Sequence, residues 1–247
     1  MTLCLVVRTM EGIAVVTDTT TSSQVQIAGI NREFHTYYRR KLVAKAKFAI
    51  VQTGIAFINN KTIADILEEA ELPEDSIAVF IEKIVEIMES EFSLDSNLLL
   101  ELPVGDNIPS FLTLGVIGYI EERPVTQSIE FRIGINPENN REVRHLIKEP
   151  FGAPNPYGID FFGDFHFIQL VIQAANDANL LKPFNILTLR EALDLARILL
   201  KFLIDFQKFL IISTVDYPIE SVVITRHKGV QSIDAMSIFE AFNLINK

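Results

Sequence analysis

Apolar residues form short strand-like runs at the start of the chain. Aliphatic residues dominate the segments 3–9, 13–17 and 42–53, the segment 34–41 contains the aromatic residues Phe34, Tyr37 and Tyr38, and the last run ends at Gly54. Runs of this kind bounded by turn residues are typical of strands, and Glu11-Gly12 between the first two predicts a hairpin. The polar segment 19–31 opens on five consecutive hydroxyl residues and predicts a loop.

Helical spacing then replaces the strand pattern twice. Apolar residues recur at intervals of three and four, which is typical of an amphipathic helix. The predicted helices are 58–70, 77–88, 159–180 and 189–206, with a short helix at the end of the chain. Asp75 is the expected N-cap of the second helix. The remaining predicted strands are 110–119, 125–135, 142–148, 219–226 and 230–233.

The order of elements is strands, two helices, strands, two helices and strands. Strands that cluster, rather than alternate with helices, argue against a doubly wound parallel sheet. They favour two antiparallel sheets packed together with a helix layer outside each. We therefore expect an α+β fold, a four-layer α/β/β/α sandwich. No repeat or composition break divides the chain, so we expect a single domain over residues 1–247.

Charge and hydropathy exclude several classes of function. A net charge of −10 repels phosphate backbones, so no nucleic-acid partner is expected. The longest apolar stretch, 198–212, contains Lys201, Asp205 and Lys208, and the first eleven residues do not have the pattern of a signal peptide. The single cysteine fits a reducing compartment. We expect a cytoplasmic protein that does not contact a membrane.

Few residues suggest a metal or a cofactor. The four histidines lie far apart without metal-like spacing, and no glycine-rich phosphate loop is present. Cys4 stands among apolar neighbours in a predicted strand, where a small core residue is expected rather than a nucleophile. We expect no cofactor and no metal.

Thr2 is a candidate nucleophile because removal of Met1 would make it the first residue. The hydroxyl of an N-terminal threonine can attack a carbonyl while its own α-amino group accepts the proton. That amino group has a pKa near 7.7–8.0, so much of it can be neutral at working pH. Threonine is a common second residue, so this position alone carries little weight.

Two charged residues strengthen this hypothesis. Asp18 ends the second strand of the predicted hairpin, which returns it beside the start of the first strand and hence near Thr2. Lys41 opens another predicted strand. A lysine held there by Asp18 would lower the pKa values of the threonine hydroxyl and amine through its positive charge.

The order of these motifs resembles the proteasome beta subunits and their bacterial relatives. Those relatives include the ancestral beta subunit group and a ring peptidase that works with an ATPase. Asp18 follows Thr2 by 16 residues, which is the family spacing. The matching segments are Thr2, 15–18 (VVTD), 40–42 (RKL), 51–54 (VQTG), 222–225 (VVIT) and 228–229 (KG).

The resemblance implies an N-terminal-nucleophile (Ntn) hydrolase fold and a threonine-type amide hydrolase, a peptidase, that forms an acyl-enzyme on Thr2. It implies that Asp18 and Lys41 tune the nucleophile and that the N–H of Gly54 faces the oxyanion. It also implies a peptide or small amide as substrate, a homo-oligomeric ring and an ATPase as a possible partner.

The chain departs from the family pattern at three places. The segment 158–164 contains no serine where members usually place one near the nucleophile. The expected Asp and Ser before the late strand are Ile212 and Val215, with Ser213 or Asp216 as possible substitutes, and a frequent arginine is Thr20. Two alternatives therefore stay open: a catalytically inactive scaffold or binding subunit, and an acylase that acts on a small non-peptide amide.

Overall fold

The computed structural model describes most of the chain. The described residues are 3–19, 21–27, 30–36, 40–94, 100, 102, 104, 110–138, 140–150, 155–163, 166–207, 215 and 217–233. For residues 21–27 and 30–36 the description covers the backbone only.

One five-stranded sheet contains both ends of the described chain. Its strand order is β12-β1-β2-β13-β14, and every neighbouring pair is antiparallel. The strands are β1 (Leu3–Arg8), β2 (Ile13–Asp18), β12 (Gly158–Gly163), β13 (Ile219–Thr225) and β14 (Gly229–Ser232). The predicted opening hairpin is present, with Cys4 opposite Thr17.

The second five-stranded sheet has the order β11-β10-β9-β6-β5 and is also antiparallel throughout. Its strands are β5 (Leu42–Ala44), β6 (Ala49–Gly54), β9 (Leu112–Ile120), β10 (Arg123–Ile135) and β11 (Arg141–Ile147). The run predicted as one strand over 42–53 is thus two strands. A turn separates them in which the Lys45 N–H donates to the Phe48 carbonyl at 2.9 Å.

The loop expected over 19–31 is wrong. The backbone forms a two-stranded sheet of β3 (Thr21–Ile27) and β4 (Ile30–Thr36), paired from Thr21 opposite Thr36 to Ile27 opposite Ile30. Polar and β-branched residues alternate in Gln24-Val25-Gln26-Ile27, which is the period of a strand. The hydroxyl run does not oppose this, because threonine also favours strands. Only 34–36 of the strand expected over 34–41 is strand among the described residues.

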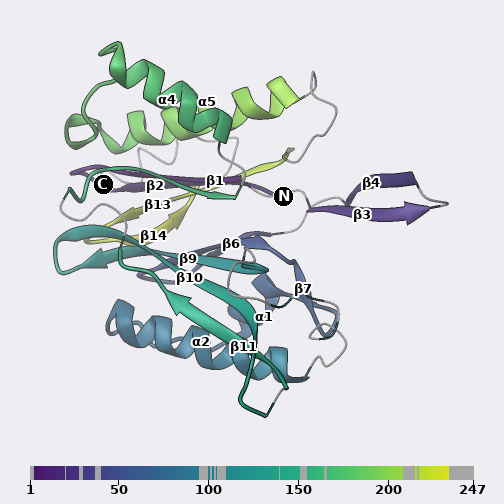
Figure 1. The fold of residues 1–247 in the computed structure, drawn as a ribbon. Coiled ribbons are helices and arrows are strands. Elements are labelled where there is room, and N and C mark those ends of the chain that lie inside the picture. The colour runs from purple at the N-terminus through teal and green to yellow at the C-terminus, as the bar shows by residue number, and fades with distance from the viewer. Residues whose placement is uncertain are drawn as a thin grey trace.

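Helices cover the outer face of each sheet (Figure 1). The helices α4 and α5 lie over the sheet of β1 and β2, and α1 and α2 lie over the sheet of β9 and β10. The bounds are α1 (Ile63–Glu69), α2 (Ile77–Leu94), α4 (His166–Asp177) and α5 (Leu189–Gln207), and a 3-10 turn η1 (Phe184–Ile186) precedes α5. None of the helices in the described ranges is both long and apolar enough to cross a bilayer.

Three helix predictions need correction at their first turn. The segment 58–70 begins with the small hairpin of β7 (Phe57–Ile58) and β8 (Lys61–Thr62), and Thr62 then caps α1 by accepting the Asp65 N–H. The hydroxyl of Ser76, rather than Asp75, accepts the Val79 N–H at the start of α2. Residues 159–163 are strand β12, not helix, because their side chains alternate between the two faces of the sheet.

Three apolar clusters separate the layers. One lies between α1, α2 and the second sheet, and another lies between α4, α5 and the first sheet. The third lies between the two sheets, where it joins Cys4 and Val6 of β1 to Leu42, Ile117 and Phe162. The two sheets therefore pack face to face, and Cys4 is a core residue as the sequence predicts.

Candidate active site

Asp18 and Lys41 form a buried ion pair between the two sheets. The Lys41 Nζ donates to the Asp18 Oδ2 at 2.9 Å, and the side chains of Lys41 and Asp18 are 3% and 0% exposed, respectively. The sequence prediction that these residues lie within salt-bridge reach is confirmed. Removing one member of a buried pair leaves an uncompensated charge, which costs about 3–5 kcal/mol. The pair is therefore fixed in place by the fold.

Strand ends bring the two residues together. Asp18 is the last residue of β2, opposite Ile219 of β13. Lys41 stands just before β5, and its carbonyl accepts the Gln52 N–H at 3.0 Å. Since β2 and β5 belong to different sheets, the ion pair spans the gap between the sheets at the end where β2 finishes.

The second oxygen of Asp18 binds the N-terminal end of β1. The Leu3 N–H donates to the Asp18 Oδ1 at 2.9 Å in a buried hydrogen bond. The Leu3 nitrogen belongs to the peptide bond that joins residues 2 and 3. Thr2 and Met1 themselves lie outside the described residues. The hairpin thus returns Asp18 to the start of β1, as expected.

Burial is the main influence on the Lys41 ammonium, and it lowers the pKa of Lys41 from its ordinary 10.5. The negative charge of Asp18, the hydrogen bond to Asp18 and the negative charge of Glu220 each act in the opposite direction. A lysine with a lowered pKa releases its proton more readily, so the balance between burial and these two carboxylates determines its charge.

Gly54 ends β6 with a backbone conformation that favours glycine. Its φ is +104°, and a Cβ at this position would lie 2.2 Å from the Phe111 carbonyl oxygen. Backbone groups alternate sides along a strand. The Gln52 N–H donates to the Lys41 carbonyl at 3.0 Å, so the regular alternation of a strand would direct the Gly54 N–H to the same side. Thr2 lies outside the described residues, so the role of Gly54 as an oxyanion donor stays a prediction.

The segment 158–164, which has no serine where family members usually have one, contributes a structural ion pair to the sheet. Asp160 of β12 forms a buried bidentate pair with Arg8 of β1, with Oδ2 2.7 Å from Nε and Oδ1 2.9 Å from Nη2. This pair joins the edge strand to the sheet. Further along, Val215 is buried and its N–H donates to Gln207. Thr20, Ile212, Ser213 and Asp216 lie outside the described residues.

Cys4 does not compete for the role of nucleophile. Burial, followed by the negative charges of Asp18 and Asp160, raises the pKa of the Cys4 thiol well above its usual value. A thiol that keeps its proton is a poor nucleophile. Within the described part of the chain, no cluster of three or more His, Cys, Asp or Glu side chains could hold a metal ion.

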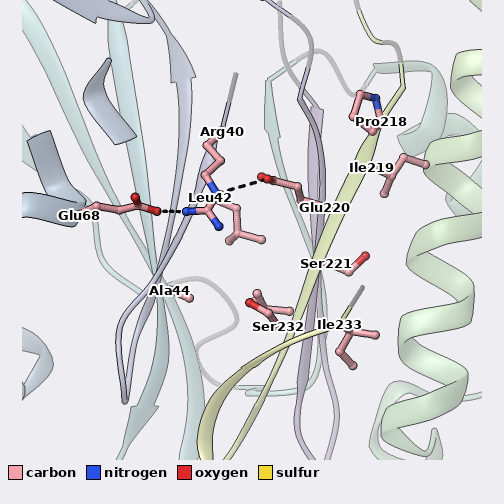
Figure 2. A pocket seen from close by; sticks show the side chains of 11 residues that line it. Arg40, Leu42, Ala44, Glu68, Pro218, Ile219, Glu220, Ser221, Ser232 and Ile233 are labelled. Carbon is pink, nitrogen blue, oxygen red and sulfur yellow. Dashed lines mark hydrogen bonds and ion pairs between the residues drawn. The ribbon is translucent and has the colours of Figure 1, made fainter. Parts of the chain in front are cut away.

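A polar pocket of about 420 Å³ lies beside the ion pair, between β5 and the β13–β14 hairpin (Figure 2). Its wall includes Arg40 and Leu42, which flank Lys41 in sequence, and Ile219, which pairs with Asp18. Lys41 and Asp18 do not line it. The pocket is therefore a neighbour of the candidate site rather than the site itself.

Two ion pairs cross this pocket, and no spacing in the sequence indicates them. The Arg40 guanidinium pairs with Glu68 of α1 and lies 3.6 Å from the Glu220 Oε1 of β13 (Figure 2). These partners are far apart in sequence: Glu68 belongs to α1, Glu220 belongs to β13, and Arg40 lies in the segment just before β5. Only the packing of the two sheets brings them together.

Comparison with known proteins gives a likeness of fold. No protein-family model matches the sequence, and no curated protein matches it. Among solved structures, the Anbu (Gly-1) mutant from Hyphomicrobium sp. strain MC1 superposes with a TM-score of 0.56 and 16% identity, over 100% of this chain and 92% of that one. The chain has the fold of Anbu.

A second structure supports this result. Anbu, the ancestral beta-subunit, from Yersinia bercovieri superposes with a TM-score of 0.52 and 14% identity, over 99% of this chain and 94% of that one. The resemblance inferred from the motifs is therefore confirmed as a likeness in fold that extends over the whole chain. At these identities the likeness shows the fold and does not by itself assign an activity.

Proposed function

We propose that the chain is a threonine-type Ntn amide hydrolase, a peptidase that acts through an acyl-enzyme on Thr2. In this proposal the fold is a single four-layer α/β/β/α domain of the Ntn-hydrolase type over residues 1–247. Lys41 and Asp18 tune the nucleophile, and Gly54 donates to the oxyanion. The substrate is a peptide or a small amide.

The observation that carries the proposal is the position of the Asp18 carboxylate. One oxygen accepts the Leu3 N–H and the other accepts the Lys41 ammonium, both at 2.9 Å. The carboxylate thus ties a buried cation to the peptide bond that follows Thr2. A structural ion pair needs no such link to the second residue, whereas an N-terminal nucleophile requires a positive charge close to it.

The reaction follows from these groups. With Met1 removed, the α-amine of Thr2 accepts the hydroxyl proton as the oxygen attacks the substrate carbonyl carbon. The Lys41 ammonium stabilises the developing charge on the attacking oxygen, and the Gly54 N–H stabilises the oxyanion. The amine proton then passes to the leaving nitrogen as the C–N bond breaks. Water, deprotonated by the same amine, hydrolyses the ester and restores Thr2.

Hydrolysis by processed protein tests the proposal. Intact mass first establishes that Met1 is absent, because an amide nitrogen cannot act as the base. We expect turnover of at least one member of a panel of fluorogenic peptides and acyl amides. Thr2→Ala abolishes this turnover, and Thr2→Ser, which keeps a hydroxyl, retains part of it. A processed and folded protein that hydrolyses none of the panel contradicts the proposal.

The second candidate function is a catalytically inactive proteasome-like scaffold or binding subunit. The observation that favours it is the altered surroundings of the site: β12 contains no serine, and Val215 is a buried apolar residue at an expected polar position. This candidate predicts that Thr2→Ala and Lys41→Ala leave every measurable property of the folded protein unchanged except stability.

We further infer a homo-oligomeric ring in the cytoplasm, with an ATPase as a possible partner. Exposed apolar side chains on the α4–α5 layer support self-association: Leu170 and Ile198 are 65% and 64% exposed, and Phe202 is also exposed. Exposed apolar residues that gather on one face mark an interaction surface. The single cysteine, which is reduced and buried, is compatible with the cytoplasm.

A further inference from the structure

A second carboxylate lies close to the ion pair, on the strand that neighbours β2 and 3.6 Å from the side chain of Arg40, the residue before Lys41. Glu220 lies on β13 opposite Thr17, the residue before Asp18. Its negative charge acts on Lys41 in the same direction as that of Asp18, raising the pKa of Lys41. The sequence pattern and the motifs that resemble the family assign no role to this residue.

Arg40 shares Glu220 with the lysine. Its Nε lies 3.6 Å from the Glu220 Oε1, and its guanidinium also pairs with Glu68 of α1 (Figure 2). The charges therefore alternate from the surface to the interior in the order Glu68, Arg40, Glu220, Lys41 and Asp18. Glu68 and Arg40 are exposed, and from Arg40 inward the exposure falls from 54% to 18% for Glu220 and 3% for Lys41.

This arrangement of charges offsets part of the energetic cost of burying the Lys41 ammonium. Burial disfavours the ammonium form, and Asp18 divides its two oxygens between Lys41 and the Leu3 N–H. A second negative charge offsets part of the cost of burial. A cation beside that second charge weakens its effect, because opposite charges screen each other.

We propose that Glu220 is a positioning residue for Lys41: its carboxylate holds the lysine in the charged form, and Arg40 controls how strongly Glu220 does so. The consequence for catalysis rests on the proposed function, whereas the effect on the charge of Lys41 does not. The described charged groups around Lys41 are Asp18 from β2, Glu220 from β13, the adjacent Arg40 and, through Arg40, Glu68 from α1.

Nuclear magnetic resonance of isotopically labelled lysine tests this directly on the full chain. The Lys41 signal is assigned by its loss in Lys41→Arg, and its titration is followed in each variant. Glu220→Gln lowers the midpoint of the Lys41 titration, because a stabilising negative charge is lost. Arg40→Gln raises it, because Lys41 loses the repulsion of a neighbouring cation and Glu220 then acts on Lys41 without a competing one. Glu220→Asp, which keeps the charge, restores the midpoint toward that of the unchanged protein.

Glu68→Gln is the matched control. It removes a carboxylate that also binds Arg40 but that lies on the far side of Arg40 from Glu220. We expect the Lys41 midpoint to move less in Glu68→Gln than in Glu220→Gln. An unchanged midpoint in Glu220→Gln, or equal shifts in both variants, overturns the proposal. If Glu220→Gln fails to fold, Glu220→Thr replaces it, because threonine is neutral and suits a strand, and an unchanged Lys41 midpoint in that variant overturns the proposal as well.

Activity separates this proposal from the proposed function. If both hold, the pH profile of kcat/KM moves in the same direction as the Lys41 midpoint in Glu220→Gln and Arg40→Gln. If the midpoint moves as expected while no variant and no substrate gives turnover, the positioning role stands and the proposed hydrolase function fails. A moved pH profile with an unmoved Lys41 midpoint contradicts the positioning role alone.

Discussion

At the scale of single residues, the candidate site depends on one buried cation and the groups that hold it. Lys41 reaches Asp18 across the space between the sheets, and Asp18 also binds the first described peptide nitrogen of β1. Burial and the carboxylates act on Lys41 in opposite directions. The charge of Lys41 is therefore a property of the fold that can be measured without a substrate.

The lowered pKa of Lys41 makes stability depend on pH. The folded state releases this proton at a lower pH than the unfolded state, whose lysine has the ordinary pKa of 10.5. Between the two pKa values the unfolded state binds more protons, so the contribution of Lys41 to the unfolding free energy rises with pH. Arginine does not titrate in this range.

Urea unfolding from neutral pH to 10.5 checks this expectation. The difference in unfolding free energy between the unchanged protein and Lys41→Arg grows in favour of the unchanged protein as pH rises. A difference that stays constant or shrinks across the window would show that the pKa of Lys41 is not lowered in the folded state.

At the scale of elements, the ends of strands position the site. Asp18 ends β2, Lys41 precedes β5 and Gly54 ends β6. The two sheets bring these ends together because their inner faces share the apolar cluster that contains Cys4, Leu42 and Val51. The rigid strands behind each end fix the direction in which its polar group points.

Gly54→Ala tests the requirement at the end of β6. An alanine at a φ of +104° is strained, and its Cβ would overlap the Phe111 carbonyl, 2.2 Å away. We expect a loss of about 1–3 kcal/mol in unfolding free energy, and loss of turnover if Gly54 donates to the oxyanion. Gly158→Ala is the matched control, since the nearest atom to its Cβ is 3.7 Å away.

Chemical denaturation measures the unfolding free energy of the two glycine variants, and turnover is measured on the same preparations. Equal stability of Gly54→Ala and Gly158→Ala would contradict the strain argument. Full turnover in a folded Gly54→Ala would contradict the role of the Gly54 N–H.

The local pattern of apolar and polar residues correctly predicts the elements in which apolar residues recur at regular spacing. The hairpin of β1 and β2, the strands β9 to β11 and the helix α5 lie close to their expected bounds. The segment 159–163 was predicted as helix because its apolar residues also suit helical spacing. Pairing with β1, a contact more than 150 residues away in sequence, makes it a strand. Such pairing overrides local preference.

The candidate site was predictable only in part, for a similar reason. Asp18 could be placed near the start of β1 because a hairpin is a local structure. Lys41 could be placed beside Asp18 only as a hypothesis, which the family resemblance supported, since β2 and β5 lie in different sheets. Glu220 and Arg40 come together through packing between sheets, so no spacing in the sequence indicated them.

At the scale of the whole molecule, the two helix layers differ in what they expose. The α4–α5 layer presents Leu170 and Ile198 with most of their surface accessible, and Phe167, Phe202 and Phe206 stack beside them. On α2, Val79 is also exposed. The proposal of a ring therefore predicts which helix layer a second copy covers.

Ile198→Glu tests whether a second copy of the chain covers the α4–α5 layer. A charge buried against a second copy opposes association, so we expect Ile198→Glu to shift the assembly toward monomers in sedimentation velocity at micromolar concentration. Val79→Glu, at an exposed apolar position on the other helix layer, is the matched control and leaves the assembly intact. A monomeric unchanged protein contradicts the ring, and disruption by Val79→Glu alone places the contact on the α1–α2 layer.

The most direct test of the central claim is to trap the acyl-enzyme on the N-terminal threonine. Processed protein is treated with a β-lactone, which acylates an activated hydroxyl, and the adduct is located by mass spectrometry of the N-terminal peptide. The account predicts a single added acyl group on Thr2, which is absent in Thr2→Ala and strongly reduced in Lys41→Ala. No adduct on Thr2 in folded, Met1-processed protein, or equal labelling in Lys41→Ala, would contradict it.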